Sequence, residues 1–300
     1  MYYKIADCFV KYEPNYMYMQ KKIKPYEERF HGESENSCIY LGYKSDAYYK
    51  KKQKMHPEIT CEKLEYVYVG AEFNRKILKY GGIMIHSSAV EVDGKAYLFS
   101  APCGTGKSTH TKQWQKYFGA DQAIIINDDK PVLRRLEDGW YAYGTPFSGK
   151  TDENVNKKVK LQGICMLERG ENRIRQIQPA EAIPLILQQT IRPKNEKYLG
   201  KMMEIMDQLL REVPVYRMQC DISEEAVKMS YEGIKKEQNE VKKRIYYERT
   251  CRKICSSSGR RRARGISGND TDECDRRIFM GMSLRREDKT GIDRSVFGEI

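Results

Sequence analysis

Residues 82–109 (GIMIHSSAVEVDGKAYLFSAPCGTGKST) place a hairpin directly before a glycine-rich loop and the start of a helix. Two apolar runs, 89–92 and 95–99, flank Asp93-Gly94. This dipeptide predicts a type I′ hairpin turn, because both central residues of that turn need a positive φ. The second run continues into the loop at 101–108. A strand, a loop and a helix in this order predict a sheet with a helix packed against it.

The loop APCGTGKS matches the phosphate-loop pattern G-x-x-x-x-G-K-[ST], except that Ala101 replaces the first glycine. Gly104 and Gly106 allow the tight turn that points backbone N–H groups at phosphate oxygens. We expect Lys107 to reach the β- and γ-phosphates and Ser108 to bind Mg²⁺. The predicted nucleotide-binding residues are Cys103, Gly104, Thr105, Gly106, Lys107, Ser108 and Thr109. They open a helix whose dipole favours an anion. An ordinary glycine-rich turn is the alternative.

A β-branched run, 123–127, ends in the acidic pair Asp128-Asp129. A buried strand with this ending places carboxylates at the edge of the sheet where ligands bind in α/β proteins. Adjacent side chains on a strand point in different directions. One carboxylate can therefore hold Mg²⁺ while the other accepts a proton from an attacking hydroxyl. A solvated acidic turn is the other interpretation.

Two further residues are candidates for the same site. His86 comes just before the hairpin, which can return it to the phosphate loop, and both a catalytic and a structural role are open. Lys150 ends the glycine-bracketed loop 144–150 (GTPFSGK), which could close over a transferred phosphate. An ordinary surface loop explains the second pattern equally well.

The pattern of apolar residues predicts three regions. Residues 1–80, rich in Tyr and Lys, carry short apolar runs that predict an antiparallel β accessory layer, including a strand near 64–69 and a short helix over 71–80. Residues 81–240 predict a catalytic domain with a mixed β-sheet and flanking helices, an α/β fold leaning towards α+β. Expected helices of this domain cover 109–118, 179–191, 195–213 and 223–236, and expected strands cover 159–167 and 215–220.

Residues 241–300 differ from the rest in composition. They hold 12 Arg and 4 Lys, whereas residues 1–240 hold 10 Arg and 28 Lys. They predict a basic, disordered tail, either a contact for an anionic surface or a stretch read in a shifted frame past the domain's end. Because most of the net charge of +12 lies in this tail, nucleic-acid binding by the folded part is not expected.

The bulk composition narrows the class of protein further. No apolar run approaches the roughly 20 residues of a membrane helix, and the N-terminal residues lack the order of a signal peptide. The 9 cysteines are scattered without a C-x-x-C pair, so reduced thiols are expected rather than a zinc site. We therefore expect a cytoplasmic protein without membrane contact.

His86, the hairpin, the loop 101–109 and Asn127-Asp128-Asp129 together resemble the C-terminal catalytic domain of bacterial HPr kinase/phosphorylase. More distantly, they resemble ATP-dependent phosphoenolpyruvate carboxykinase. The resemblance implies that Lys107 and Ser108 bind phosphate and Mg²⁺. It also implies that Asp128 is the catalytic acid/base, Asp129 a metal ligand and His86 a neighbour that tunes the carboxylate. The roles of Asp128 and Asp129 remain interchangeable.

The resemblance implies a Mg-ATP-dependent kinase that phosphorylates a hydroxyl, with Ser or Thr of a peptide or small protein as the favoured acceptor. Phosphorolysis is not expected, because the second signature of that family is missing. A nucleotide-binding sensor or scaffold without turnover and a carboxykinase-like metabolic enzyme are the alternatives. Assembly into a homo-oligomer is left open.

Overall fold

The computed structural model describes residues 1–31, 37–149 and 151–235. All of the described residues belong to the first of two units, which spans residues 1–241. The predicted tail, the loop residue Lys150 and the last residue of the expected helix 223–236 lie outside the described residues. No helix of the described ranges has the length and apolar character needed to cross a bilayer.

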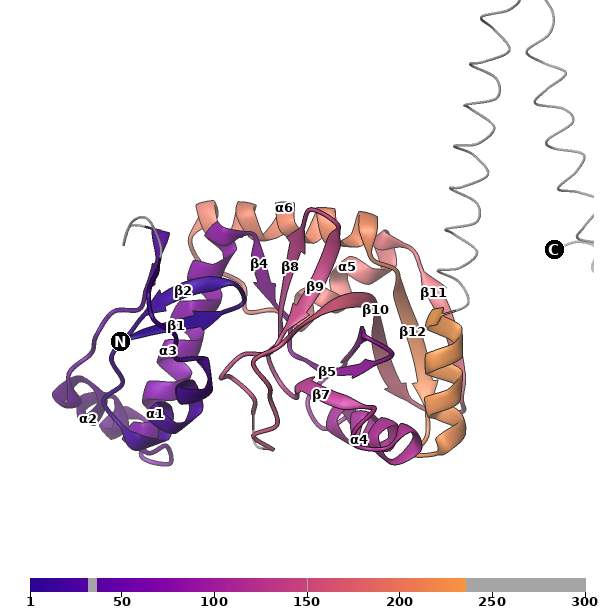
Figure 1. Ribbon diagram of the computed structural model, residues 1–300, viewed down its shortest axis with the longest axis horizontal. Helices are drawn as coiled ribbons and strands as arrows, with labels where there is room; N and C mark the ends of the chain where they lie inside the picture. Colours follow the sequence, from indigo (N-terminus) through magenta and orange to yellow (C-terminus); the bar gives the residue numbers. More distant parts are fainter. Residues whose placement is uncertain (32–36, 150, 236–300) are drawn as a thin grey trace, which may run out of the picture. The chain divides into compact units, whose positions relative to one another are not determined.

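A nine-stranded mixed sheet forms the centre of the first unit (Figure 1). Its strands are β4 (Gly82–Met84), β5 (Ser87–Val92), β6 (Lys95–Ser100), β7 (Ile124–Asn127), β8 (Val132–Leu136), β9 (Gly139–Tyr143), β10 (Lys158–Arg169), β11 (Arg173–Ile177) and β12 (Val215–Cys220). The main path runs β4-β8-β9-β10-β6-β5-β7, and β12 joins β10 to β11. β10 is parallel to β6 and β12, while the other pairs are antiparallel. The prediction of a mixed α/β fold is confirmed at this level.

The long strand β10 divides the sheet. Residues 158–160 of β10 pair with β9, and residues 164–169 pair with β12. Both partners lie along the same edge of β10, since β6 pairs with its other edge. A register shift between Leu161 and Gly163 separates the two parts. A Cβ at Gly163 would lie 3.0 Å from Ile234 Cγ2, so glycine lets the last described helix approach the strand closely.

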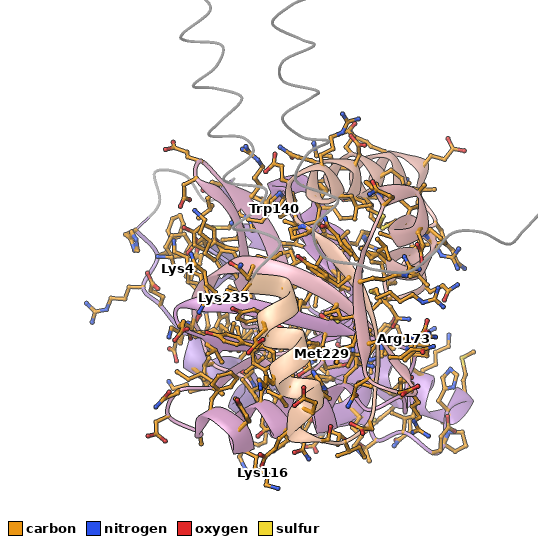
Figure 2. The ribbon with its side chains drawn as sticks, turned by 90° about the vertical axis from the view of Figure 1, so that its right-hand side faces the viewer. Lys4, Lys116, Trp140, Arg173, Met229 and Lys235 are labelled. Carbon is orange, nitrogen blue, oxygen red and sulfur yellow. The ribbon has the colours of Figure 1, made fainter. Side chains whose placement is uncertain are left out.

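Helices cover both faces of the sheet. α5 (Pro179–Gln188) and α6 (Glu196–Glu212) pack on one face, and α4 (Lys107–Phe118) and the helix 224–235 pack on the other. β6 contributes side chains to the hydrophobic clusters on both faces. Leu98 packs in the cluster beneath α5 and α6, and Phe99 packs in the cluster beneath α4 and the helix 224–235. Figure 2 looks onto the helix 224–235, with Met229 and Lys235 labelled on it.

The turns and caps follow the sequence closely. Asp93 and Gly94 have φ of 53° and 67°, as the predicted type I′ turn of the β5–β6 hairpin requires. Asn195 caps α6 by accepting a hydrogen bond from the Tyr198 N–H, and Ser223 caps the helix 224–235 through the Ala226 N–H.

The N-terminal region is more helical than expected. It contains the strands β1 (Tyr2–Ile5), β2 (Cys8–Lys11) and β3 (Ile39–Tyr40), with α1 (Met17–Ile23), the 3-10 turns η1 (Lys24–Tyr26) and η3 (Leu78–Tyr80), α2 (Asp46–Met55) and α3 (Cys61–Ile77). The strand predicted near 64–69 is wrong, because this segment lies inside α3. Thr60 caps α3, and Leu64, Val69 and Phe73 are buried on one side of it. The tyrosines and valines of 64–69 favoured a strand locally, but the burial pattern follows the helical repeat.

One hydrophobic cluster, which crosses residue 80, joins side chains of the N-terminal region to side chains of the sheet. Phe73 and Ile77 of α3 pack in it together with Met84 of β4, Val132 of β8 and Phe147. The accessory region thereby supports the edge of the sheet and the loop that follows β9.

Candidate active site

The topology brings three chain segments to one edge of the sheet. β5 is antiparallel to both of its neighbours, with Ser87 opposite Ser100 of β6 and Ala89 opposite Asn127 of β7. The start of β5 and the ends of β6 and β7 therefore meet. Three segments that are far apart in the sequence adjoin these ends. His86 precedes β5, the loop 101–106 follows β6, and the acidic pair Asp128-Asp129 follows β7.

The loop after β6 has backbone angles that suit an anion site. Gly104 and Gly106 adopt φ of 78° and 125°, which other residues rarely adopt. α4 begins at Lys107, with Gly106 as a cap that offers no side-chain acceptor and with no acidic residue in the first turn. The first N–H groups of any helix have no intrahelical acceptor. In α4 no side-chain cap accepts from them either, so they can donate to a phosphate.

Lys107 is the first residue of α4 and directly follows this loop. Its side chain is buried, and Nζ donates a hydrogen bond of 2.9 Å to the Ala101 carbonyl. Burial lowers the pKa of Lys107, while the negative charges of Asp129 and Asp128 oppose that effect. Among the described residues the ammonium has no ion-pair partner within contact distance. A bound phosphate would supply the anion that this cation lacks.

Asp128 is held by hydroxyl groups. Ser88 Oγ donates a hydrogen bond of 2.8 Å to Oδ1, and the Thr151 hydroxyl donates to Oδ2. Ser88 Oγ also lies 2.9 Å from Thr111 Oγ1, which donates to the Lys107 carbonyl. The buried carboxylate is thus connected to the first turn of α4 through side chains.

Asp129 has different neighbours. Its Oδ1 lies 3.3 Å from Nε2 of His86, and its Oδ2 pairs with the Lys130 ammonium. The Asn127 side chain accepts hydrogen bonds from the N–H groups of both Asp129 and Lys130, at 2.9 and 2.7 Å. This turn separates the two carboxylates, so that Asp128 faces hydroxyls and Asp129 faces cationic or imidazole nitrogens.

The surroundings of His86 favour its neutral form. Burial lowers its pKa, the nearby Lys107 lowers it further, and Asp129 opposes both. The backbone of His86 is fixed by hydrogen bonds, since its N–H donates to the Gln189 carbonyl and its carbonyl accepts from Ser100 Oγ. Nδ1 of His86 lies 3.2 Å from Oε1 of Gln189, which can only accept, so in the neutral ring Nδ1 carries the proton and Nε2 faces Asp129 without one.

The loop after β9 borders the site beside Asp128 and Asp129. Gly149, with φ of 68°, lies against Asp129, and a Cβ there would be 2.9 Å from the Asp129 Cβ. Lys22 of α1 donates hydrogen bonds to Ser148 and Asp152 in this loop, and the Tyr66 hydroxyl accepts from the Gly149 N–H. The N-terminal region therefore holds the segment that carries Thr151.

A cavity of about 680 Å³ adjoins the phosphate loop on the side of β10 and β12. Its walls come from the loop glycines, from His110 and Gln113 of α4, and from the ends of β10 and β12. Arg169, the last residue of β10, donates hydrogen bonds to the carbonyls of Gly104 (2.6 Å) and Thr105 (3.3 Å). This arginine therefore fixes the outer part of the loop.

The site fits a hydrated Mg²⁺ better than a fully protein-bound metal. Among the described residues, no group of at least three His, Cys, Asp or Glu side chains is placed to hold a metal ion. Mg²⁺ beside a nucleotide needs only one or two carboxylates, with phosphate and water as the remaining ligands. Ser108 has a hydroxyl without a hydrogen-bond partner in the described part of the chain, and Asp129 follows the last residue of β7 by two positions. These two residues provide suitable oxygen donors.

Several contacts were not expected from the sequence. Ser88 and Thr151 on Asp128, Gln189 on His86 and Arg169 on the loop carbonyls all come from distant parts of the chain. The position of Arg169 at the carboxyl end of a core strand was the one signal that could have identified it.

Comparisons with known proteins give a distant structural similarity. No protein-family model matches the chain, and no curated protein matches it. Among solved structures, the Hpr(Ser) kinase/phosphatase from Coxiella burnetii matches 53% of this chain and 98% of its own length, with 9% sequence identity and a TM-score of 0.32. A similarity of this degree does not assign the chain to a family.

Proposed function

We propose that this protein is a Mg-ATP-dependent kinase that transfers the γ-phosphate to a hydroxyl group. The observation that carries this proposal is the meeting of the phosphate loop, Lys107 and two differently surrounded carboxylates at one edge of the sheet. We further propose a Ser or Thr of a peptide or small protein as the acceptor.

The proposed reaction is a direct transfer. The loop N–H groups and Lys107 hold the β- and γ-phosphates. The acceptor oxygen forms a bond to the γ-phosphorus, and the bond from that phosphorus to the oxygen shared with the β-phosphate breaks, so that ADP leaves. Asp128 takes the proton of the acceptor hydroxyl.

Three features of the site fit these roles. The Thr151 hydroxyl already donates to Asp128 Oδ2, so an acceptor hydroxyl can take its place at the same oxygen. Ser108 and Asp129 would hold Mg²⁺, which neutralises phosphate charge when bound. Nε2 of His86 lies 3.3 Å from Asp129 Oδ1, so this imidazole adjoins the proposed metal ligand.

The first test is phosphate transfer from γ-labelled ATP to a peptide library or a cell lysate, followed by identification of the product. Asp128→Asn keeps the shape of the side chain but removes the base, and we expect transfer to fall by about 10²- to 10⁴-fold with ATP binding retained. Normal transfer by this variant would show that Asp128 is not the proton acceptor.

Lys107→Ala tests the phosphate loop. We expect loss of ATP binding, because the variant removes the buried cation that faces the phosphates. Lys116→Ala is the matched control, since Lys116 lies exposed in the last turn of the same helix (Figure 2). Equal ATP affinity of the two variants, measured by calorimetry, would contradict the proposed site.

A further inference from the structure

The cavity beside the phosphate loop has the size of a small-molecule site. Its volume of about 680 Å³ lies within the usual range for such pockets. Leu167 and Ile222 add apolar surface to its wall, and the Ile222 side chain is 71% exposed although it is large and apolar. Phosphates on the first turn of α4 would leave the rest of a nucleotide next to this wall.

One polar side chain of the cavity wall is almost fully buried. His110 is 5% exposed and packs edge-on against the Phe99 ring, with centroids 4.5 Å apart. The Trp114 indole N–H donates a hydrogen bond of 3.2 Å to Nε2 of His110. Because an indole nitrogen can only donate, Nε2 must carry the lone pair.

The tautomer of His110 follows from this contact. Burial lowers its pKa to about 4, so the ring is neutral and holds a single proton at physiological pH. That proton is on Nδ1, since Nε2 accepts from Trp114. Within the described ranges Nδ1 has no hydrogen-bond partner, although His110 lines the cavity. The wall therefore offers a fixed hydrogen-bond donor that the protein itself does not use.

We propose that His110 recognises the nucleobase, with its Nδ1–H donating a hydrogen bond to a ring nitrogen of adenine in this cavity. The inference rests on the proposed function, because it needs the phosphates of the same nucleotide on the loop. Under this proposal His110 contacts the base of the nucleotide, whereas Lys107 and the loop N–H groups contact its phosphates.

A pair of variants separates the two ring nitrogens of His110. His110→Gln can place its amide oxygen near the position of Nε2 and accept from Trp114, but it leaves no donor at the position of Nδ1. His110→Asn places its amide nitrogen at the position of Nδ1 and keeps that donor. We expect the Gln variant to bind Mg-ATP about five- to tenfold more weakly than the wild type, and the Asn variant to recover most of this loss.

Tripolyphosphate is the base-free probe. We expect both variants to bind it as the wild type does, whereas Lys107→Ala loses both ligands. Equal loss of ATP and tripolyphosphate in the Gln variant would overturn the inference in favour of a structural role. Unchanged ATP affinity would also overturn it. A wild-type protein that binds neither ligand would refute the proposed function itself.

A second measurement uses the wild-type protein and so does not depend on how the variants fold. Adenine has three ring nitrogens that can accept this hydrogen bond, and 1-deaza, 3-deaza and 7-deaza forms of ATP each lack one. We expect one of the three to bind about five- to tenfold more weakly than ATP. Equal affinity for all three analogues and ATP would refute donation to a ring nitrogen.

Discussion

At the scale of single residues, each charged side chain of the candidate site has a different kind of neighbour. Asp128 accepts hydrogen bonds from two hydroxyls, and Asp129 faces His86 and Lys130. Among the described residues, Lys107 Nζ reaches only a backbone carbonyl. The residue types and their spacing in the motifs were visible in the sequence. Their partners were not, because Ser88, Thr151 and Gln189 approach through tertiary contacts that have no local pattern.

The pKa of His110 leads to a pH-dependent stability. Its pKa of about 4 in the folded protein lies below the usual value of 6.5. Above pH 6.5 the ring is neutral in both states and contributes nothing. Between pH 6.5 and 4 the unfolded chain binds a proton that the folded protein does not, so the free energy of unfolding falls as the pH falls, by about 3 kcal/mol in total.

Urea unfolding of the wild type and of His110→Gln at pH 7 and pH 4 measures this contribution. We expect the loss of stability on acidification to be about 3 kcal/mol smaller in the variant, because all other titrating groups are shared. An identical loss in both proteins would show that His110 is not buried in its neutral form.

At the scale of elements, local signals gave good predictions where they were strong. The Asp93-Gly94 turn, the helix after the glycine-rich loop and the helix expected over 195–213 all depend on residues close together in the chain. The segment 64–69 was assigned wrongly because its aromatic and branched residues suit a strand. The caps and burial of a 17-residue helix outweigh that preference.

Gly106 provides a test of the phosphate loop as an element. Its φ of 125° lies outside the region that L-residues occupy comfortably, while a Cβ there would meet no atom within 4 Å. We expect Gly106→Ala to cost about 1–3 kcal/mol through backbone strain alone and to weaken ATP binding.

The matched control is Gly200→Ala in α6, where a Cβ also meets no atom within 4 Å but the backbone is helical. This variant should gain about 0.5–1 kcal/mol of stability. Denaturant unfolding measures both changes, and a destabilised Gly200→Ala would contradict the assignment of cost to the backbone angle.

At the scale of the whole molecule, the class of fold could be predicted from the sequence, but the order and pairing of the strands in the sheet could not. Alternating helices and strands around a phosphate loop indicated a mixed α/β fold. The division of the sheet at β10, where β9 and β12 share one edge, depends on pairings between residues far apart in the sequence. No periodicity within a strand specifies such partners.

The hydrophobic cluster that crosses residue 80 makes stability a property of the first unit as a whole. Phe73 is fully buried in α3 and its ring lies 5.7 Å from that of Phe147. We expect Phe73→Ala to cost about 3–5 kcal/mol in a single unfolding transition monitored by circular dichroism.

Val67→Ala is the control on the same helix, because Val67 is 56% exposed. It should change the free energy of unfolding by less than about 0.5 kcal/mol. Separate unfolding transitions for the accessory region and the sheet would argue against a shared core.

The two sides of the candidate site are supported by different hydrophobic clusters. Phe147, in the loop beside Asp129, belongs to the cluster shared with the N-terminal region, whereas Ala101 and Trp114 of the phosphate loop and α4 belong to the cluster under the helix 224–235. Substitutions that remodel the first cluster can therefore alter the side of the site beside Asp129 while the loop 101–106 and α4 stay unchanged. In evolutionary terms, a chain built this way can diverge on one side of the site through its N-terminal region while the other side is conserved; under the proposed function, this would change the acceptor but keep the phosphate donor.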